Sequence, residues 1–144
     1  FVMNLSARNQ LKATVATVKK GAVNDEVSLR LADGTMLTSI ITETSCENLG
    51  LKEGAEAYAV IKASNVMIGE GEGGLKLSAR NQLKGKITSV TEGAVNCEIL
   101  VTLAGGEKIA SIITKASTGR LGLKEGKEVC AIIKASDIMV GVKA

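Results

Sequence analysis

The chain consists of two tandem copies of one sequence unit. Shifting the 144-residue sequence by 72 positions aligns residues 5–69 with residues 77–141 without a gap, and 36 of the 65 aligned positions are identical. The two copies must therefore fold alike, and the length suits two small domains. A run of glycine and glutamate separates them and is typical of a flexible linker. We predict a first domain over residues 1–69, a linker over 70–74 and a second domain over 75–144.

Short apolar runs with partial period-two alternation predict strands in each copy. In the first copy these runs cover residues 11–18, 23–31, 36–41, 57–62 and 66–68. A short helix is expected over residues 42–50, because the segment opens with a threonine N-cap and stops at a glycine. Five strands and one helix per copy predict an all-β protein of two tandem OB-like five-stranded barrels, each with one short helix.

The composition argues against several functional classes. The absence of histidine removes the usual general base and zinc ligand, so we do not expect an enzyme. One Phe, one Tyr and no Trp leave no platforms for stacking bases, and a net charge of +3 is too small to indicate a phosphate-backbone partner. The cysteines, Cys46, Cys97 and Cys130, occupy different positions in the two copies, which favours incidental buried thiols.

The sequence also indicates where the protein works. No apolar run approaches the roughly 20 residues of a membrane span, and no signal-peptide pattern is visible. We therefore expect a cytoplasmic protein without a membrane partner. Each repeat of about 65 residues has little aromatic bulk for a core, so we also expect a homo-oligomer that shares apolar strand surface.

Three polar motifs are kept by both copies, and the first pairs Ser6 with Arg8. On an extended segment these two side chains point to the same side. The guanidinium offers a planar fork of donors and the serine an adjustable hydroxyl, which together suit an oxygen-rich anion. An edge strand with a solvated arginine is an alternative interpretation. The second copy repeats the motif at Ser78 and Arg80.

The other two motifs add hydroxyl groups and a second cation. One is Thr42 with Ser45, at the start of the expected helix, where N–H groups and the helix dipole attract anions; plain capping explains it as well. The last is Lys62-Ala63-Ser64, which an ordinary surface also explains. Their counterparts are Thr114, Ser117, Lys134, Ala135 and Ser136. Together the motifs predict a receptor for a tetrahedral oxyanion and no site for a bare metal cation, which would need anionic oxygen ligands.

The repeated blocks resemble those of the molbindin, or Mop, family. They are Ser-Ala-Arg-Asn-Gln-Leu-Lys, Gly-Ala-Val-Asn-x-Glu, Leu-Gly-Leu-Lys-Glu-Gly and Ile-Lys-Ala-Ser-x-x-Met, and they span nearly all of both copies. Two such units in one chain resemble the di-Mop cytoplasmic molybdate-binding proteins. The resemblance implies molybdenum storage and homeostasis, assembly into a trimer, and molybdate or tungstate as ligand at interfaces between units, with no cofactor.

The resemblance also implies which residues hold the anion. In the first copy these are Ser6, Arg8, Lys62, Ala63 and Ser64, facing Thr42 and Ser45 of a neighbouring unit. In the second copy they are Ser78, Arg80, Lys134, Ala135 and Ser136, facing Thr114 and Ser117. A second kind of site near the symmetry axis would use the turns formed by Gly21, Ala22, Val23, Asn24, Gly93, Ala94, Val95 and Asn96, although a tight turn alone explains those residues.

Two alternative functions stay open at this point. An OB-type protein could bind nucleic acid, against which the missing aromatic residues count. A molybdate-responsive regulatory module is also conceivable, but the chain contains no helix-turn-helix segment or Walker motif through which it could act.

Overall fold

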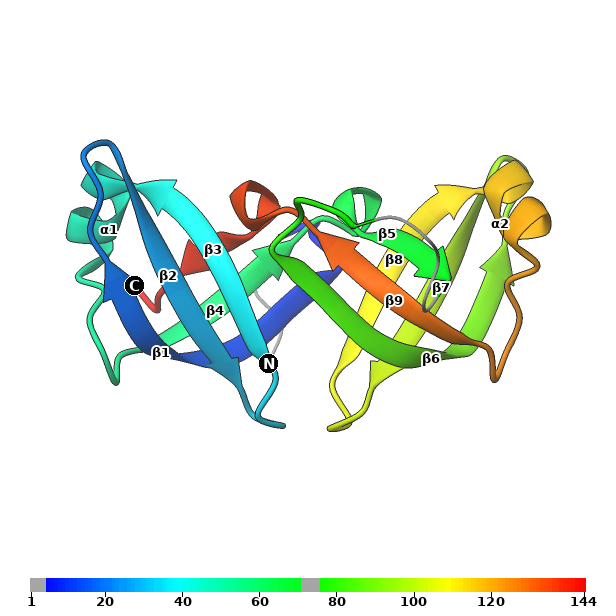
Figure 1. Cartoon of the computed structure of the whole chain (residues 1–144), viewed down its shortest axis with the longest axis horizontal. Coiled ribbons are helices and arrows are strands. Elements are labelled where there is room, and N and C mark those ends of the chain that lie inside the picture. Colours follow the sequence, from blue (N-terminus) through cyan, green and yellow to red (C-terminus); the bar gives the residue numbers. More distant parts are fainter. Residues whose placement is uncertain (1–4, 71–75) are drawn as a thin grey trace.

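The computed structural model describes residues 5–70 and 76–144 and shows two similar β-rich halves side by side (Figure 1). The elements of the first repeat are β1 (Asn9–Lys19), β2 (Asn24–Leu31), β3 (Met36–Thr42), α1 (Glu43–Leu49), β4 (Glu56–Ile61), η1 (Ala63–Asn65) and β5 (Met67–Glu70). Those of the second are β6 (Asn81–Glu92), β7 (Asn96–Leu103), β8 (Lys108–Thr114), α2 (Lys115–Leu121), β9 (Glu128–Ile133), η2 (Ala135–Asp137) and β10 (Met139–Gly141). The helices α1 and α2 lie at the two far ends of the molecule.

The local sequence signals are confirmed at the helix. The Oγ1 atom of Thr42 accepts a hydrogen bond from the Ser45 amide at 3.1 Å, which satisfies one of the orphan N–H groups of the first turn. The helix ends at Gly50, whose φ of 64° is a left-handed conformation that favours glycine. The short 3-10 turns η1 and η2 after β4 and β9 were not predicted.

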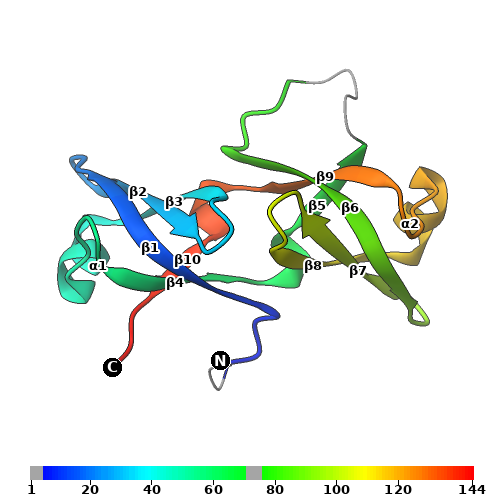
Figure 2. The same cartoon turned by 90° about the horizontal axis from the view of Figure 1, so that it is seen from below.

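The two halves exchange a strand. One sheet has the order β10-β4-β1-β2-β3 and the other β5-β9-β6-β7-β8, so each takes one edge strand from the opposite repeat. Figure 2 shows β10 beside β4, and β5 beside β9. The prediction that residues 66–68 complete the sheet of their own repeat is therefore wrong. The reason is the path after η1, where the Val66 carbonyl accepts a hydrogen bond from Ser111 of β8, which leads the chain onto the second sheet.

The exchange joins the cores of the two repeats. Val66 and Ile138, which precede the exchanged strands, are each 1% exposed. They join the buried aliphatic side chains of both sheets in one cluster. Because each repeat buries part of its apolar surface in the other, the pair supplies some of the core that a single repeat lacks. The three cysteines are buried and free, as predicted.

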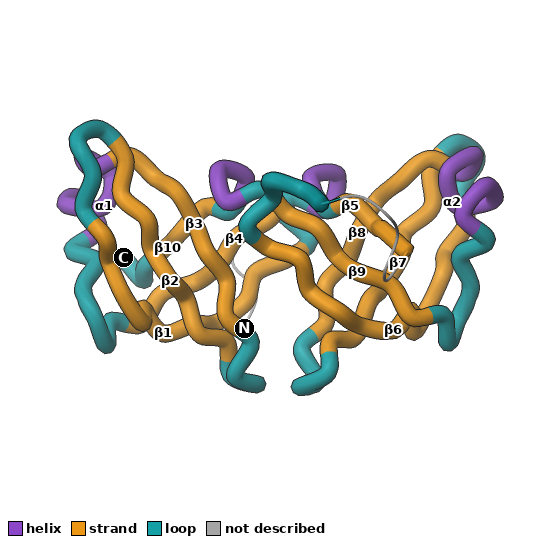
Figure 3. The backbone as a smooth tube through the Cα atoms, in the orientation of Figure 1, coloured by secondary structure: helices purple, strands orange, loops and turns teal. Residues whose placement is uncertain are grey.

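A second contact between the halves is made by two turns that approach each other at the lower edge of Figure 3. The Glu107 amide donates to Oδ2 of Asp33 at 3.0 Å. Gly105, the counterpart of Asp33 in the second repeat, lies so close that an added Cβ would sit 2.7 Å from the Asp33 side chain. Of the predicted linker, Glu70 belongs to β5 and residues 71–74 lie outside the described residues.

Candidate functional site

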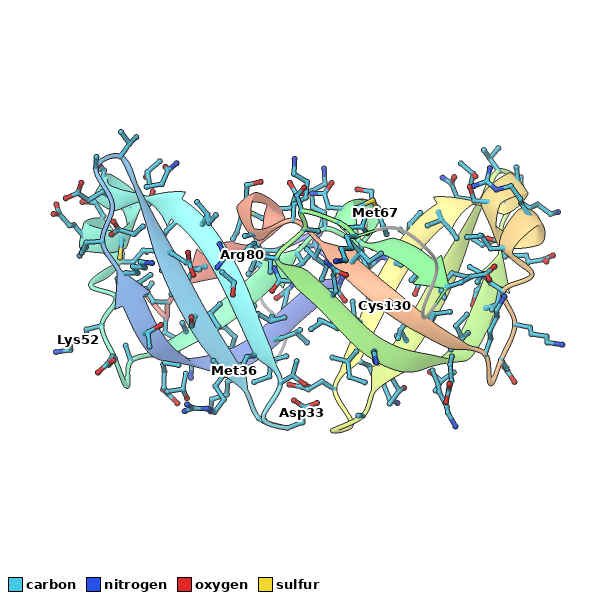
Figure 4. The ribbon with its side chains drawn as sticks, viewed as in Figure 1. Asp33, Met36, Lys52, Met67, Arg80 and Cys130 are labelled. Carbon is cyan, nitrogen blue, oxygen red and sulfur yellow. The ribbon has the colours of Figure 1, made fainter. Side chains whose placement is uncertain are left out.

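A cavity of about 320 Å³ opens at the seam between the repeats. Its lining includes five of the residues singled out in the sequence, the polar Ser78, Arg80, Lys134 and Ser136 and the small Ala135. Ile40 and Met67 of the first repeat also line it, so the cavity is built by both halves. Figure 4 shows Arg80 and Met67 near the middle of the molecule, where the halves meet.

Strand register brings the first and third motifs together. Asn81 at the start of β6 is the antiparallel partner of Ile133 at the end of β9. Arg80 therefore precedes one strand at the place where Lys134 leaves the other. In the first half Asn9 is the partner of Ile61, so Arg8 and Lys62 are placed in the same relation. The expected extended segment around Ser6 and Arg8 is not part of a strand, since β1 begins only at Asn9.

Each of the two arginines is held by a carboxylate of the opposite repeat. Arg80 donates from Nη1 to Oε2 of Glu26 at 3.2 Å and from Nη2 to Oε1 at 2.7 Å. Arg8 donates from Nη1 to Oε2 of Glu98, the counterpart of Glu26. The hydrogen bond from Arg80 holds the pKa of Glu26 below its usual value, so the carboxylate is ionised at neutral pH.

A buried asparagine of each repeat bonds to the main chain of the other repeat. Asn81 is 3% exposed and accepts at Oδ1 from the Thr38 amide at 2.7 Å. Its Nδ2 donates to the carbonyls of Thr38 and Ile133, at 2.8 and 3.1 Å. Asn9 does the same, accepting from the Ala110 amide and donating to the carbonyls of Ala110 and Ile61. The side-chain amide of Asn81 accepts one hydrogen bond and donates two, so it fixes β6 and β9 to β3.

The second motif lies elsewhere. Thr42 and Ser45 begin α1, and Thr114 and Ser117 begin α2, at the far ends of the molecule in Figure 1. Within one chain these hydroxyls do not line the cavity at the seam. The first amide of each helix is already bonded, from Glu43 to the Val23 carbonyl and from Lys115 to the Val95 carbonyl.

The turns suggested for a second site are exposed hairpin tips. Val23 and Val95 are 73% and 70% exposed. The Gly21 amide donates to Oδ1 of Asp25, and the Gly93 amide donates to the Asn96 carbonyl. These two backbone donors are therefore already engaged inside each tip. The remaining residues expected there are Ala22, Asn24 and Ala94, which complete the same tips.

The sequence reasoning missed Asn9, Asn81, Glu26 and Glu98 as residues of the site. Asn9 aligns with Asn81 and Glu26 with Glu98, so a comparison of the two repeats could have singled them out. An asparagine beside an arginine does not reveal a buried amide, however, because its partners lie in the other repeat. The same holds for the glutamates, whose arginines are 54 and 90 residues away in the chain.

The fold and the site together define a class of protein: two OB-like repeats that exchange strands and form at their seam an open cavity that contains two cationic side chains and two serines. The chain belongs to the TOBE domain family, whose model matches residues 5–68 and 77–140. This membership agrees with the resemblance carried by the repeated motifs.

Similar proteins support the same placement. The chain is 43% identical over 142 residues to the molybdenum-pterin-binding protein MopA of Rhodobacter capsulatus, covering 99% of this chain and 54% of MopA. It is 39% identical over 140 residues to the molybdenum transport protein ModE of Azotobacter vinelandii, covering 97% of this chain and 52% of ModE. The chain thus spans about half the length of these curated relatives.

A solved structure extends the likeness to three dimensions. The cytoplasmic molybdate-binding protein ModG, crystallised with molybdate bound, superimposes with a TM-score of 0.94 at 43% identity. The match covers 98% of this chain and 100% of the ModG chain. This match confirms the predicted architecture of two tandem OB-like units. In residues 5–70 and 76–144, no helix has the length and apolar character needed to span a bilayer.

Proposed function

We propose that the chain is a binding protein for molybdate, rather than an enzyme, and that it serves molybdenum storage and homeostasis in the cytoplasm. The observation that carries the proposal is the convergence of Arg80, Lys134 and the hydroxyls of Ser78 and Ser136 on one cavity. Charge-assisted hydrogen bonds from such donors are roughly twice as strong as neutral ones. The likeness to ModG, which was crystallised with molybdate, supports the same ligand.

Tungstate is expected to bind in the same cavities, since it has nearly the same size and charge. The first repeat would bind a second anion through Ser6, Arg8, Lys62, Ala63 and Ser64. We propose that the two repeats are the two binding units, with boundaries near those predicted from the sequence except that Glu70 belongs to β5 of the first repeat. The second unit depends on the first for part of its cavity, because Ile40 and Met67 of the first repeat line that cavity.

We also propose that the protein is an oligomer, which the size and the exposed edge of the cavity support. Four oxygens fill about 120 Å³ if each takes the share of a water molecule, well under the 320 Å³ present. Leu77 and Met67 at the cavity are 43% and 48% exposed. We propose that neighbouring chains of a trimer cover these side chains. Thr42, Ser45, Thr114 and Ser117 would then reach the cavities of adjacent chains and complete the coordination of the anion.

Equilibrium dialysis against molybdate, with molybdenum counted by elemental analysis, tests the function. Replacing Lys62 and Lys134 by alanine should weaken binding by about tenfold or more, since a charged donor is lost from every cavity. The matched control replaces Lys52 and Lys124, an equivalent pair of exposed lysines outside the cavity, and should leave binding unchanged. Wild-type protein that binds no molybdate would refute the proposed function.

Light scattering of the purified protein tests the trimer separately. A mass three times the 14.9 kDa of the chain is expected. Because anions that bridge subunits bind only the assembled state, saturating molybdate should also raise the melting temperature. A monomer that still binds molybdate tightly would rule out the interface sites and leave the ligand assignment intact.

A further inference from the structure

The cavity arginines are oriented by the repeat to which they do not belong. Glu26 lies on β2, where it is the antiparallel partner of Ile40, a residue that lines the cavity. From there its two carboxylate oxygens accept one hydrogen bond from each terminal nitrogen of Arg80. The side chains of Arg80 and Glu26 are 48% and 30% exposed, so the pair is half-buried at the seam.

The two hydrogen bonds between Arg80 and Glu26 fix the orientation of the guanidinium as well as pairing its charge. Parallel N–H···O bonds hold the plane of the guanidinium as well as its position. Arginine has five N–H donors, and the pair with Glu26 uses two of them, so three stay available to an anion. In the pseudo-symmetric pair, Arg8 donates to Glu98 through Nη1 alone, so Glu98 holds the second guanidinium at one point.

We propose that Glu26 and Glu98 are positioning residues for oxyanion binding, each holding the arginine of the opposite repeat in the orientation that the anion meets. The inference rests on the proposed function. Its physical basis is pre-organisation: a side chain already fixed in its binding geometry loses less rotamer freedom when the ligand arrives.

Positioning and simple electrostatics predict opposite changes in anion affinity when Glu26 is neutralised. Glu26 is an anion beside a cavity for an anion, so Coulomb repulsion alone predicts that its neutralisation tightens binding. Positioning predicts the opposite, because a released guanidinium becomes mobile and loses its orientation. The direction of the change therefore separates the two effects.

The test is the molybdate affinity of Glu26→Gln combined with Glu98→Gln, measured by calorimetric titration of the full chain. Glutamine keeps the size and one accepting oxygen but loses the charge and, at Glu26, the two-point pair. We expect affinity to fall by about fivefold or more. The matched control neutralises Glu53 and Glu125, an equivalent exposed pair outside the cavity, and should leave affinity unchanged. Unchanged or tighter binding in the Glu26 and Glu98 variant would overturn the proposal.

The single variant Glu26→Gln distinguishes positioning from a general loss of structure. It disturbs only Arg80, so it should split the titration into two classes of site, one with wild-type affinity. A uniform shift of all sites would overturn the proposal. Wild-type protein without molybdate binding would refute the proposed function and this inference together, whereas normal wild-type binding with an unaffected Glu26→Gln variant refutes the inference alone.

A double-mutant cycle tests the pair of Arg80 and Glu26 directly. Arg80→Lys keeps the charge but not the planar fork, so it should weaken the same class of sites. Adding Glu26→Gln to Arg80→Lys should then cost little further affinity, because the pair that the glutamate served is already lost. Additive losses would mean that Glu26 acts independently of Arg80, contrary to the proposal.

Discussion

Asn81 pairs with the main chain of Thr38 as a neighbouring strand would, although the two residues belong to different repeats and lie 43 positions apart. The Thr38 amide donates to Oδ1 and the Thr38 carbonyl accepts from Nδ2, at 2.7 and 2.8 Å. A third bond reaches the carbonyl of Ile133, the residue before the cavity lysine Lys134. One side chain thus connects β3 to the two strands that carry the cavity.

Replacing Asn81 by alanine should destabilise the protein by about 2–4 kcal/mol, because three hydrogen bonds are lost and polar main-chain groups are left unpaired. Urea denaturation measures the change. Gln82→Ala is the control, since this neighbouring side chain is exposed and its amide donates to the Leu77 and Ala79 carbonyls. It should cost less than about 0.5 kcal/mol. Equal effects of the two substitutions would contradict the role of Asn81 as a joint.

The contact between the two turns makes Gly105 sensitive to substitution. An added Cβ would lie 2.7 Å from Asp33, so Gly105→Ala should cost about 1–3 kcal/mol in unfolding free energy. In an Asp33→Gly background the same change should cost clearly less, because the opposing side chain is gone. Gly119→Ala in α2 is the control: in the described parts of the chain, nothing beyond its two neighbours and the backbone of its own helix lies within 4 Å of the added Cβ, and alanine favours helix. A Gly105→Ala variant as stable as the control would show that the turns do not touch.

Asp25 should make stability depend on pH at the acid end. Burial opposes its ionisation, but hydrogen bonds from the Gly21 amide and the Lys20 ammonium hold the pKa of Asp25 below its usual value. A carboxyl with a lowered folded pKa contributes stability above about pH 4 and loses it as the pH falls through the folded value. Asp25→Asn should therefore reduce the difference in urea midpoint between about pH 7 and pH 3. A difference as large as that of the wild type would contradict this assignment.

A single repeat should not be a stable monomer. In residues 5–70 alone, β4 would lack the edge strand that β10 supplies, and β5 would have no β9 to pair with. Two copies can satisfy both needs by exchanging β5, so we expect an assembly with an even number of subunits. Sedimentation velocity would detect it. A folded monomer of this fragment would show that each repeat can close its own sheet.

Much of the local structure follows from the sequence, because its signals are local. The Thr42 cap, the Gly50 stop and the alternating apolar runs predicted the helix and the strands to within a few residues. The strand exchange could not be predicted in this way. The strands β4 and β9 are similar in sequence, so the pattern of β5 fits either partner, and only the path after η1 decides between them.

The residues of the candidate site also fall into two groups, those that the sequence could identify and those that depend on tertiary contacts. Arg80 and Lys134 could be singled out because both copies keep them, and the cavity contains both. Glu26 and Asn81 could not be assigned to it, because their roles depend on how one repeat faces the other. Local pattern identifies the groups that could contact an anion, whereas the groups that hold them in place come from tertiary contacts.

Anomalous diffraction at the molybdenum edge, from crystals soaked in molybdate, tests the central claim most directly. The account predicts strong peaks at the seam between the repeats, placed so that the oxygens of the anion accept hydrogen bonds from the Ser78 hydroxyl, the Arg80 guanidinium and the Lys134 ammonium. Peaks confined to exterior lysines such as Lys52, with nothing at the seam, would contradict it.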